Sequence, residues 1–298
     1  MSLSFPDLPY EAIMLQGKDI NTFLQGQITT DVQLCTDCQF APGYFCQHTG
    51  KVLANAYAFI YDADSAILLC HKSVSSTLLA HLKPYAALSR VSMNIQTDVC
   101  YGLIHEHQAP HVPKPYHYVR QDQCTHAMIS HTTSLIFGPH HAVKTWFAKN
   151  QHTNITHTDL WYYTLMQEAF SLLSSESANL FTPNMLSDVP SLAVSLSKGC
   201  YNGQEIIART HHLGKPKRKR QLFTCTSFSA HIPTGSQITL LDRGQIQAHV
   251  LVSAMHHQSQ TLWLDLVAPI TQGPQSFLFS PPKTPENVIS FTAEPFNG

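Results

Sequence analysis

Charged side chains are scarce in this sequence. The 298 residues include 18 lysines and arginines and 19 aspartates and glutamates, which together make up 12% of the chain, whereas an ordinary soluble domain carries about 25%. The formal net charge of −1 excludes a strong overall field that would draw the protein to nucleic acid or to an anionic membrane. Disorder does not follow from the low charge, because hydrophobic residues make up 43% of the chain and can form a core.

Cysteines, long apolar runs and targeting signals are also lacking. Eight cysteines in 298 residues are too few for a disulfide scaffold. No run approaches the roughly 20 apolar residues that a membrane-spanning helix needs. The first residues, Met-Ser-Leu-Ser-Phe-Pro, lack the basic and apolar regions of a signal peptide. We therefore expect a reduced, soluble, cytoplasmic protein.

The common signatures of nucleotide-binding and hydrolytic sites are absent from the sequence. It contains no P-loop, no glycine-rich dinucleotide fingerprint and no nucleophile elbow. Cys35 and Cys38 have the spacing of a metal-binding pair, but no second pair at regular spacing accompanies them. The 19 histidines are dispersed along the chain, so they do not indicate a metal store. We predict no metal site.

The first two thirds of the chain alternate strand and helix patterns. The expected helices begin at Asp19, which is predicted to cap a helix that continues to Ile28, and at Ser73, and two more cover 140–150 and 160–173. This pattern is typical of α+β units with helices on one face of an antiparallel sheet. The expected strands are 12–16, 40–46, 52–61, 66–71 and 91–95, with two or three more over 99–137.

The character of the sequence changes at Leu222. Five or six short strands separated by turns follow it, and they predict a small antiparallel β-barrel. We therefore expect a first α+β subdomain over 1–98, a second over 99–220 and a C-terminal barrel over 221–298. The basic run Lys215-Pro-Lys-Arg-Lys-Arg220 lies at the second boundary. It is typical of a nucleic-acid patch, but its position between folded units favours a solvated linker.

The most informative segment is Lys198-Gly-Cys-Tyr-Asn-Gly-Gln-Glu, residues 198–205. Its two glycines permit a tight turn, and a helix is expected from Gln204 onward, with Glu205 in the first turn, where a negative charge is favoured. Cys200 would then lie near free backbone amides and close to Lys198, and both favour a reactive thiolate. A buried structural cysteine in a glycine turn is the alternative interpretation of the same residues.

The signature Lys198-Gly-Cys-Tyr-x-Gly-Gln-Glu resembles that of the YgfZ family of folate-binding proteins, which are relatives of the glycine-cleavage T-protein, an aminomethyltransferase. Three other segments resemble family motifs in the same order. They are Leu15–Val32, the strand-turn-strand Gly43–Leu53, and Phe181-Thr-Pro-Asn-Met-Leu186. The resemblance covers about residues 10–220.

The resemblance implies a T-protein-like α+β fold, with two α+β subdomains and a C-terminal antiparallel β-barrel around a central folate pocket. It implies tetrahydrofolate or a derivative as cofactor. It also implies a role in the maturation or repair of iron–sulfur proteins, including tRNA-modifying enzymes, which would be the protein partners. Cys200 is the candidate catalytic residue. The candidates for folate binding are Lys198, Tyr201, Gln204, Glu205 and Lys51.

The sequence departs from the family pattern in ways that leave other functions open. The turn His48-Thr-Gly-Lys51 stands where Pro-Lys-Gly-Arg is common, so a cation is kept but a bidentate guanidinium is lost. No counterpart of the T-protein's catalytic aspartate is identified, so enzymatic activity stays open. The alternatives are an aminomethyltransferase-like one-carbon transfer enzyme and an RNA-binding module through 215–220. A further hypothesis is that the basic run attracts the acidic glutamate tail of a folate.

Overall fold

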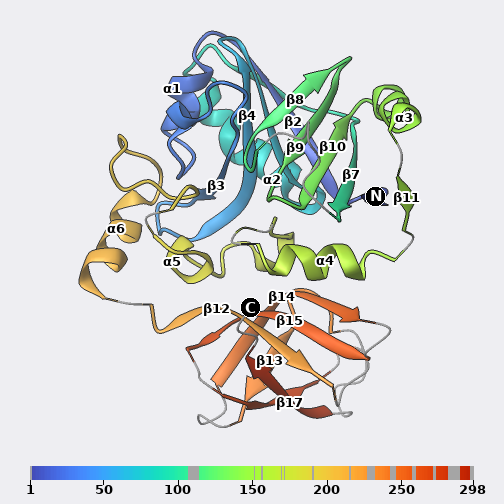
Figure 1. Cartoon of the computed structure of the whole chain (residues 1–298). Helices are drawn as coiled ribbons and strands as arrows, with labels where there is room; N and C mark the ends of the chain where they lie inside the picture. The colour runs from blue at the N-terminus through green and yellow to red at the C-terminus, as the bar shows by residue number, and fades with distance from the viewer. Residues whose placement is uncertain are drawn as a thin grey trace.

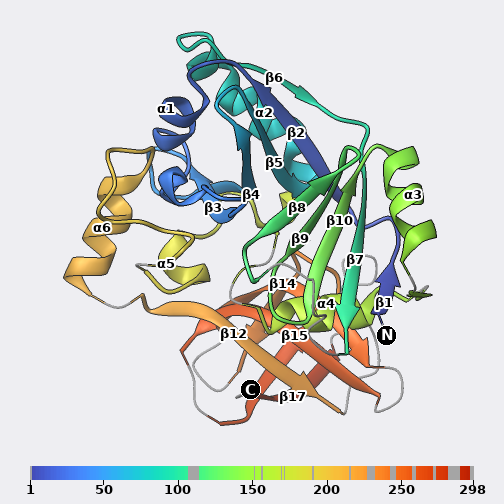
Figure 2. The ribbon, with the colours of Figure 1, turned by 45° about the horizontal axis from the view of Figure 1, so that its top comes forward.

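The computed structural model of the chain describes residues 2–106, 114–150, 152–155, 157–168, 170, 172–189, 191–214, 216–226, 232–241, 246–256, 260–270, 273–280 and 289–295. They form two β-sheets with helices and a closed β-barrel (Figure 1). Helix α4 (Asp159–Met166) lies between the sheets and the barrel in Figure 1, and in the turned view of Figure 2 it overlaps the barrel. The predicted architecture, α+β units followed by an antiparallel barrel, is therefore confirmed. Within the described ranges, no helix has the length and apolar content needed to cross a membrane.

The first sheet is antiparallel and has the strand order β3-β4-β5-β2-β6. Helices α1 (Ile20–Gln25) and α2 (Lys72–Ala86) pack on one of its faces. Helix α2 buries Val74, Leu78 and Leu82, which recur every four residues along one stripe. The strands are β2 (Tyr10–Gln16), β3 (Ala41–Cys46), β4 (Val52–Asp62), β5 (Ser65–His71) and β6 (Ser92–Ile95), close to the predicted runs.

The second sheet has the order β11-β1-β7-β10-β9-β8 and is antiparallel except for the pair β1 and β11. Helix α3 (His140–Lys149) packs on it through Ala142 and Val143. The N-terminal strand β1 joins this sheet, so the chain crosses between the two sheets near residue 6. The predicted domain boundaries stay a prediction. The strands are β1 (Ser2–Phe5), β7 (Val99–His105), β8 (Tyr118–Gln121), β9 (Cys124–Met128), β10 (Thr133–Gly138) and β11 (Thr153–Asn154).

The remaining faces of the two sheets meet in one core that also reaches the barrel. Phe59 from the first sheet contacts Phe137 from the second, with ring centroids 5.1 Å apart. Trp161 of α4 is fully buried in the same core. It lies directly on Gly102, where an added Cβ would come within 2.5 Å of the indole ring. Only glycine at this position lets α4 approach the sheet so closely.

The C-terminal barrel is closed and has the strand order β12-β15-β14-β13-β16-β17, with β12 and β17 paired. Its interior is filled by apolar side chains, among them Phe223, Phe277 and Phe291. The ring centroids of Phe277 lie 5.4 Å from Phe223 and 5.5 Å from Phe291. The strands are β12 (Arg218–Cys225), β13 (Gln237–Leu240), β14 (Ile246–His256), β15 (Thr261–Pro269), β16 (Gln275–Phe279) and β17 (Ile289–Pro295).

Short elements connect α4 to the barrel. The segment predicted as loop over 174–198 contains the turn η2 (Ser175–Ser177) and the one-turn helix α5 (Pro183–Leu186), and α6 (Gln204–Leu213) follows it. Another short turn, η1 (Val32–Leu34), follows α1.

Four local predictions were wrong. Asp19 precedes α1, but its side chain makes no capping bond, because both carboxylate oxygens bind Arg90 at 2.8 and 2.9 Å. Helix α1 ends at Gln25, before Ile28. Helix α4 ends at Met166 and does not continue to 173. The basic run is not a free linker, because Arg218–Arg220 form the first residues of strand β12.

Two histidines share one buried hydroxyl in the second sheet. The Nε2 atoms of His105 and His126 lie 2.9 and 3.0 Å from the Oγ of Ser134, which is fully buried. Burial lowers the pKa of His126 to about 4, and the nearby His105 adds to this shift. Burial also lowers the pKa of His105. The folded protein therefore favours the neutral form of both rings.

We predict that the protein loses stability as the pH falls from about 6.5 toward 4. Over this range the unfolded chain takes up protons on His105 and His126, whereas the folded chain resists them, so the free energy of unfolding decreases on the order of 1–3 kcal/mol. Above pH 6.5 both states hold neutral rings, and this contribution is constant. Urea unfolding at several pH values gives the free energy of unfolding as a function of pH. Between pH 6.5 and 4 this free energy should change less steeply with pH in His126→Gln than in the wild type. The exposed His140→Gln serves as control and should keep the wild-type slope.

Candidate functional site

The four segments that carry the family resemblance meet in one place. The signature turn packs against the turn of residues 47–51. Gly203 has a φ of +82°, and an added Cβ there would lie 2.8 Å from the carbonyl oxygen of Gln47. Gly50 has a φ of +73°, and its added Cβ would lie 2.8 Å from Ile206 of α6. Both glycines are therefore required for the close contact between the two turns as well as for their backbone conformation.

Lys198 joins the signature to the segment after α1. Its ammonium is buried and donates to the carbonyl oxygens of Ile28 and Thr30 at 2.6 and 2.7 Å. The same ammonium lies 4.9 Å from the ring centroid of Tyr201. Burial lowers the pKa of Lys198 to about 8. Two of its three donors are thus used inside the protein, where they satisfy carbonyls that no helix or sheet pairs.

The neighbours of Lys198 in the signature are also held by the protein. Tyr201 is buried, and its hydroxyl donates to the carbonyl oxygen of Ser195 at 3.0 Å. Burial raises its pKa. Gln204 is the first residue of α6, as predicted. Glu205 is exposed in the first turn of that helix and pairs with Arg209 at 2.6 Å.

Lys51 connects the second motif to the third. Its ammonium donates to the carbonyl oxygen of Leu180 at 2.7 Å, and the amide of Val52 donates to the carbonyl oxygen of Phe181 at 2.8 Å. The side chain of Asn184 in α5 in turn contacts the carbonyl oxygen of Ile207 at 3.5 Å. The roles predicted for Lys51, Lys198, Tyr201, Gln204 and Glu205 in binding a folate stay predictions.

Cys200 faces outward, unlike its neighbours in the signature. It is exposed, and it lines a pocket of about 310 Å³ against α1. The other residues that line this pocket are polar or small, and they belong to α1, to Gly26 and to η1; they are Asn21, Thr22, Gln25, Gly26, Val32 and Gln33. The structure therefore presents this thiol at the surface, while Tyr201 beside it points into the core.

Sequence reasoning missed a second polar cluster, which lies where the two sheets meet the barrel. Glu168 follows α4 and is half-buried. Burial raises its pKa, against the opposing effects of a hydrogen bond from Ser130 and of the charges on Arg220 and His131. Burial raises the pKa of Tyr57 and of Tyr116, and the nearby carboxylate of Glu168 adds to both shifts.

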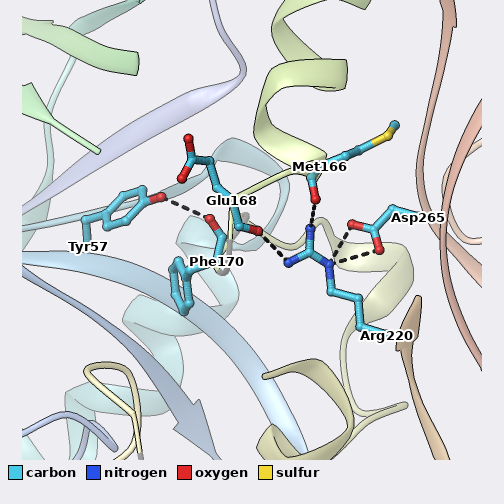
Figure 3. Close-up of polar contacts among 6 residues, drawn as sticks. All are labelled: Tyr57, Met166, Glu168, Phe170, Arg220 and Asp265. Carbon is cyan, nitrogen blue, oxygen red and sulfur yellow. Dashed lines mark hydrogen bonds and ion pairs between the residues drawn. The ribbon is translucent and has the colours of Figure 1, made fainter. Parts of the chain in front are cut away.

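Arg220 holds the backbone that carries Glu168 (Figure 3). Its Nη1 donates to the carbonyl oxygen of Glu168 and its Nη2 to that of Met166, each at 2.8 Å. Its Nε lies 2.9 and 2.8 Å from the two carboxylate oxygens of Asp265, which is fully buried. Figure 3 shows the carboxylate of Glu168 directed away from this guanidinium. The guanidinium thereby pairs the carbonyl oxygen of Met166, which the end of helix α4 leaves free.

Aromatic rings surround the backbone just after Glu168. The ring of Phe170 lies 5.2 Å from Tyr44 and 5.3 Å from Tyr57, between ring centroids. The hydroxyl of Tyr57 donates to the carbonyl oxygen of Phe170 at 3.2 Å. Burial raises the pKa of Tyr44 to about 12. Glu168 therefore lies beside a cluster of neutral aromatic side chains, which we call the aromatic cluster (Tyr44, Tyr57, Tyr116 and Phe170).

One sequence signal could have drawn attention to Glu168. It is the only acidic residue between Asp159 and Glu176, in a run that is otherwise apolar or neutral. By contrast, nothing local indicates that Arg220, in the middle of a basic run, pairs with an aspartate 45 positions further along. That placement also removes Arg220 from any RNA-binding surface formed by 215–220.

The fold is similar to that of a solved aminomethyltransferase. The aminomethyltransferase T of the glycine cleavage system from Bartonella henselae superposes with a TM-score of 0.74 at 12% sequence identity, over 99% of this chain and 85% of that chain. No protein-family model matches the sequence. The structural similarity defines the class: the chain has the T-protein fold, α+β with a C-terminal barrel.

Sequence relatives narrow this class. The protein named tRNA-modifying protein YgfZ from Klebsiella pneumoniae is 25% identical over 242 residues, which are 77% of this chain and 73% of the relative. The protein of the same name from Hamiltonella defensa is 25% identical over 89% of this chain and 85% of its own length. Together with the fold, these relatives support a protein of the YgfZ family.

We predict that Arg220→Met destabilises the protein by roughly 3–5 kcal/mol, because it leaves the carboxylate of Asp265 buried without a partner. Replacing both members of the pair, in Arg220→Met with Asp265→Leu, should recover most of this loss, since no buried charge then remains. Urea unfolding of the three proteins measures both effects. A single variant as stable as the wild type would contradict the assignment of this pair as the link between barrel and α4.

Proposed function

We propose that this protein binds a reduced folate and supports iron–sulfur enzymes that modify tRNA. The T-protein fold supports the first part, since the solved structure with this fold is an aminomethyltransferase of the glycine cleavage system. The name of the sequence relatives, tRNA-modifying protein, supports the second part. The observation that carries the proposal is the position of Glu168 beside the aromatic cluster, where both sheets meet the barrel.

The chemistry of these residues fits the pterin ring of a folate. The pyrimidine edge of a pterin carries an amino group and a ring N–H, and a carboxylate can accept both at once. The aromatic cluster places neutral rings beside Glu168, and under this proposal the flat heterocycle would pack against them. Glu168 would orient the pterin edge, and Phe170 and Tyr57 would contact its face.

Cys200 would have a role separate from the binding of the folate. Its pocket shares no lining residue with the aromatic cluster or with Glu168. An exposed thiol at a surface pocket is accessible to a macromolecular partner, and the rigid support from Lys198 and Tyr201 fixes its position. We therefore assign Cys200 to the interaction with the partner enzyme. The folate would bind beside Glu168 and the aromatic cluster, where both sheets meet the barrel.

One observation favours a second function, one-carbon transfer from an aminomethyl donor to tetrahydrofolate. The raised pKa of Glu168 lets a carboxyl group hold a proton closer to neutral pH, as general acid catalysis requires. The test is the formation of methylenetetrahydrofolate and ammonia when the protein is incubated with tetrahydrofolate and an aminomethyl donor. Turnover that Glu168→Gln abolishes would establish this function.

We predict saturable one-to-one binding of tetrahydrofolate with micromolar affinity, measured by anaerobic calorimetric titration of the reduced protein. Glu168→Gln should weaken binding by about 10- to 100-fold, because a hydrogen bond to a charged group contributes about 1.5–3 kcal/mol. Binding should also weaken as the pH falls through the raised pKa of Glu168, since the protonated carboxyl accepts less well. The exposed Glu176→Gln is the control and should bind like the wild type. No binding at millimolar folate would refute the proposal.

A separate prediction concerns the thiol. Cys200→Ala should abolish support of iron–sulfur enzyme activity in cells that lack the wild-type protein, while folate affinity and the melting temperature stay unchanged, because the side chain is exposed and distant from the core. Cys38→Ala, at the other exposed cysteine, is the matched control and should retain activity. Loss of thermal stability in Cys200→Ala would instead indicate a structural role.

A further inference from the structure

A pocket of about 320 Å³, which no step above uses, lies between helix α3, strand β7 and residues 152–154. We call it the α3 pocket. Helices α3 and α6 lie at opposite sides of the molecule in both ribbon views (Figures 1 and 2). The α3 pocket shares no lining residue with the Cys200 pocket or with the aromatic cluster. Among the residues that line it are Tyr101, His140, Lys144, Phe147, His152 and Asn154.

Three of the lining side chains are rings in mutual contact. The ring centroid of Phe147 lies 4.8 Å from that of Tyr101 and 4.4 Å from that of His152. All three side chains are partly exposed, so they present ring surface to a molecule that enters the pocket. Partly exposed aromatic rings of this kind are the surface on which proteins stack an unpaired nucleobase.

Two polar side chains give the α3 pocket a donor and an acceptor. The Oδ1 of Asn154 accepts the hydroxyl of Ser4 at 2.6 Å, so the amide can offer a ligand its two N–H donors. The Nδ1 of His152 lies 2.9 Å from the carbonyl oxygen of Asn150. Since a carbonyl only accepts, Nδ1 carries the proton, and the Nε2 of the neutral ring is an acceptor. The edge of a nucleobase carries the complementary pair, an acceptor and a donor.

Helix α3 is basic, although the net charge of the whole chain is −1. It carries Lys144 and Lys149 and no acidic residue, and Lys144 is exposed where it lines the pocket. Lys149 lies in the last turn, 3.8 Å from Asp122, and is not among the lining residues. Burial raises the pKa of Tyr101, and the nearby carboxylate of Asp7 adds to this shift. Lys144 is therefore the lysine that can bind an anion in the pocket, and Asp7 opposes it.

We propose that the α3 pocket binds one unpaired nucleotide of an RNA strand. The base packs against Tyr101 and Phe147, and a phosphate binds Lys144. The edge of the base contacts the amide of Asn154 and the Nε2 of His152. Unpaired bases of this kind are presented by the loops and ends of RNA, whereas the bases of a duplex are paired and stacked.

The size and exposure of the pocket fit this ligand. Ligand pockets range over about 300–1,000 Å³, so a volume of about 320 Å³ fits a single nucleotide. His140, Lys144 and Asn154 are exposed, so the strand can continue into solvent beyond that nucleotide. The inference goes beyond the proposed function, because it gives the chain a direct contact with RNA that does not require a folate.

The test measures the binding of a fluorescent single-stranded hexa-adenylate RNA to the full chain by fluorescence anisotropy, at about 50 mM salt, where exposed charges are weakly screened. We expect saturable binding. Adenosine monophosphate should displace the RNA, whereas ribose 5-phosphate, which lacks the base, should not. A blunt-ended RNA duplex should bind at least about tenfold more weakly, because all of its bases are paired.

Substitutions in the full chain test the individual contacts. Tyr101→Leu should weaken RNA binding about 5- to 150-fold, because it removes a ring on which the base stacks. Lys144→Gln should weaken binding about two- to fivefold and reduce the steepness of log affinity against log salt by about 0.7, the value for one phosphate of a single strand. Asp7→Asn should strengthen binding. Lys149→Gln, on the same helix but outside the pocket, is the matched control and should bind like the wild type.

Several outcomes would overturn the inference. Equal weakening by Lys144→Gln and Lys149→Gln would mean that the RNA is attracted by charge alone. Adenosine monophosphate that binds as tightly as the RNA would make the ligand a free nucleotide. Tyr101 also packs against α3, so if Tyr101→Leu lowers the melting temperature, the exposed Lys144→Gln decides the test. Absence of RNA binding at millimolar concentration refutes this inference, while the folate proposal, tested by its own titration, stands.

Discussion

The position of the barrel depends on one buried ion pair, between Arg220 and Asp265. A fully buried carboxylate must be paired, and Arg220 is the residue that pairs it. The same guanidinium binds the carbonyls of Met166 and Glu168, so the first barrel strand, the end of α4 and the backbone at Glu168 are held in one arrangement. Such a pair adds little net stability relative to an apolar core, but it selects a single docking geometry. The position of the backbone at Glu168 therefore depends on how the barrel is docked.

The eight residues of the signature have two roles: most of them hold the turn in place, and one places a thiol at the surface. Lys198 and Tyr201 are directed inward and satisfy backbone carbonyls, and Gly203 lets the turn lie against residues 47–51. Cys200, between them, is exposed. A rigid turn therefore carries an accessible thiol. The pocket beside this thiol shares no lining residue with the junction where Glu168 lies.

Much of the fold was predictable because it depends on local periodicity. Runs of strand-forming residues between turns located the strands of the first sheet and the barrel. The helical pattern of Leu78, Leu79, Leu82 and Tyr85 located α2, which buries Leu78 and Leu82. The errors arose where a distant residue intervened. Asp19 would cap α1 if its carboxylate were free, but Arg90 binds it. Helix α4 ends at Met166, whose carbonyl oxygen is bound by Arg220 of the distant barrel strand. The signature and its glycines were found as a motif, whereas Glu168 was missed because its partners come from four separate parts of the chain.

The sequence by itself determined the α+β units, the barrel and the identity of the signature, since these depend on residue periodicity and on the residues adjacent in the chain. Only the tertiary structure decided which charges are free. It placed Arg220 in the interior, Cys200 at the surface, and Lys198 on two carbonyls of a segment 170 residues away. The reason is physical: a charge or a polar group finds its partner by distance in space, and a buried group must have one. No local pattern records which distant carbonyl or carboxylate that partner is.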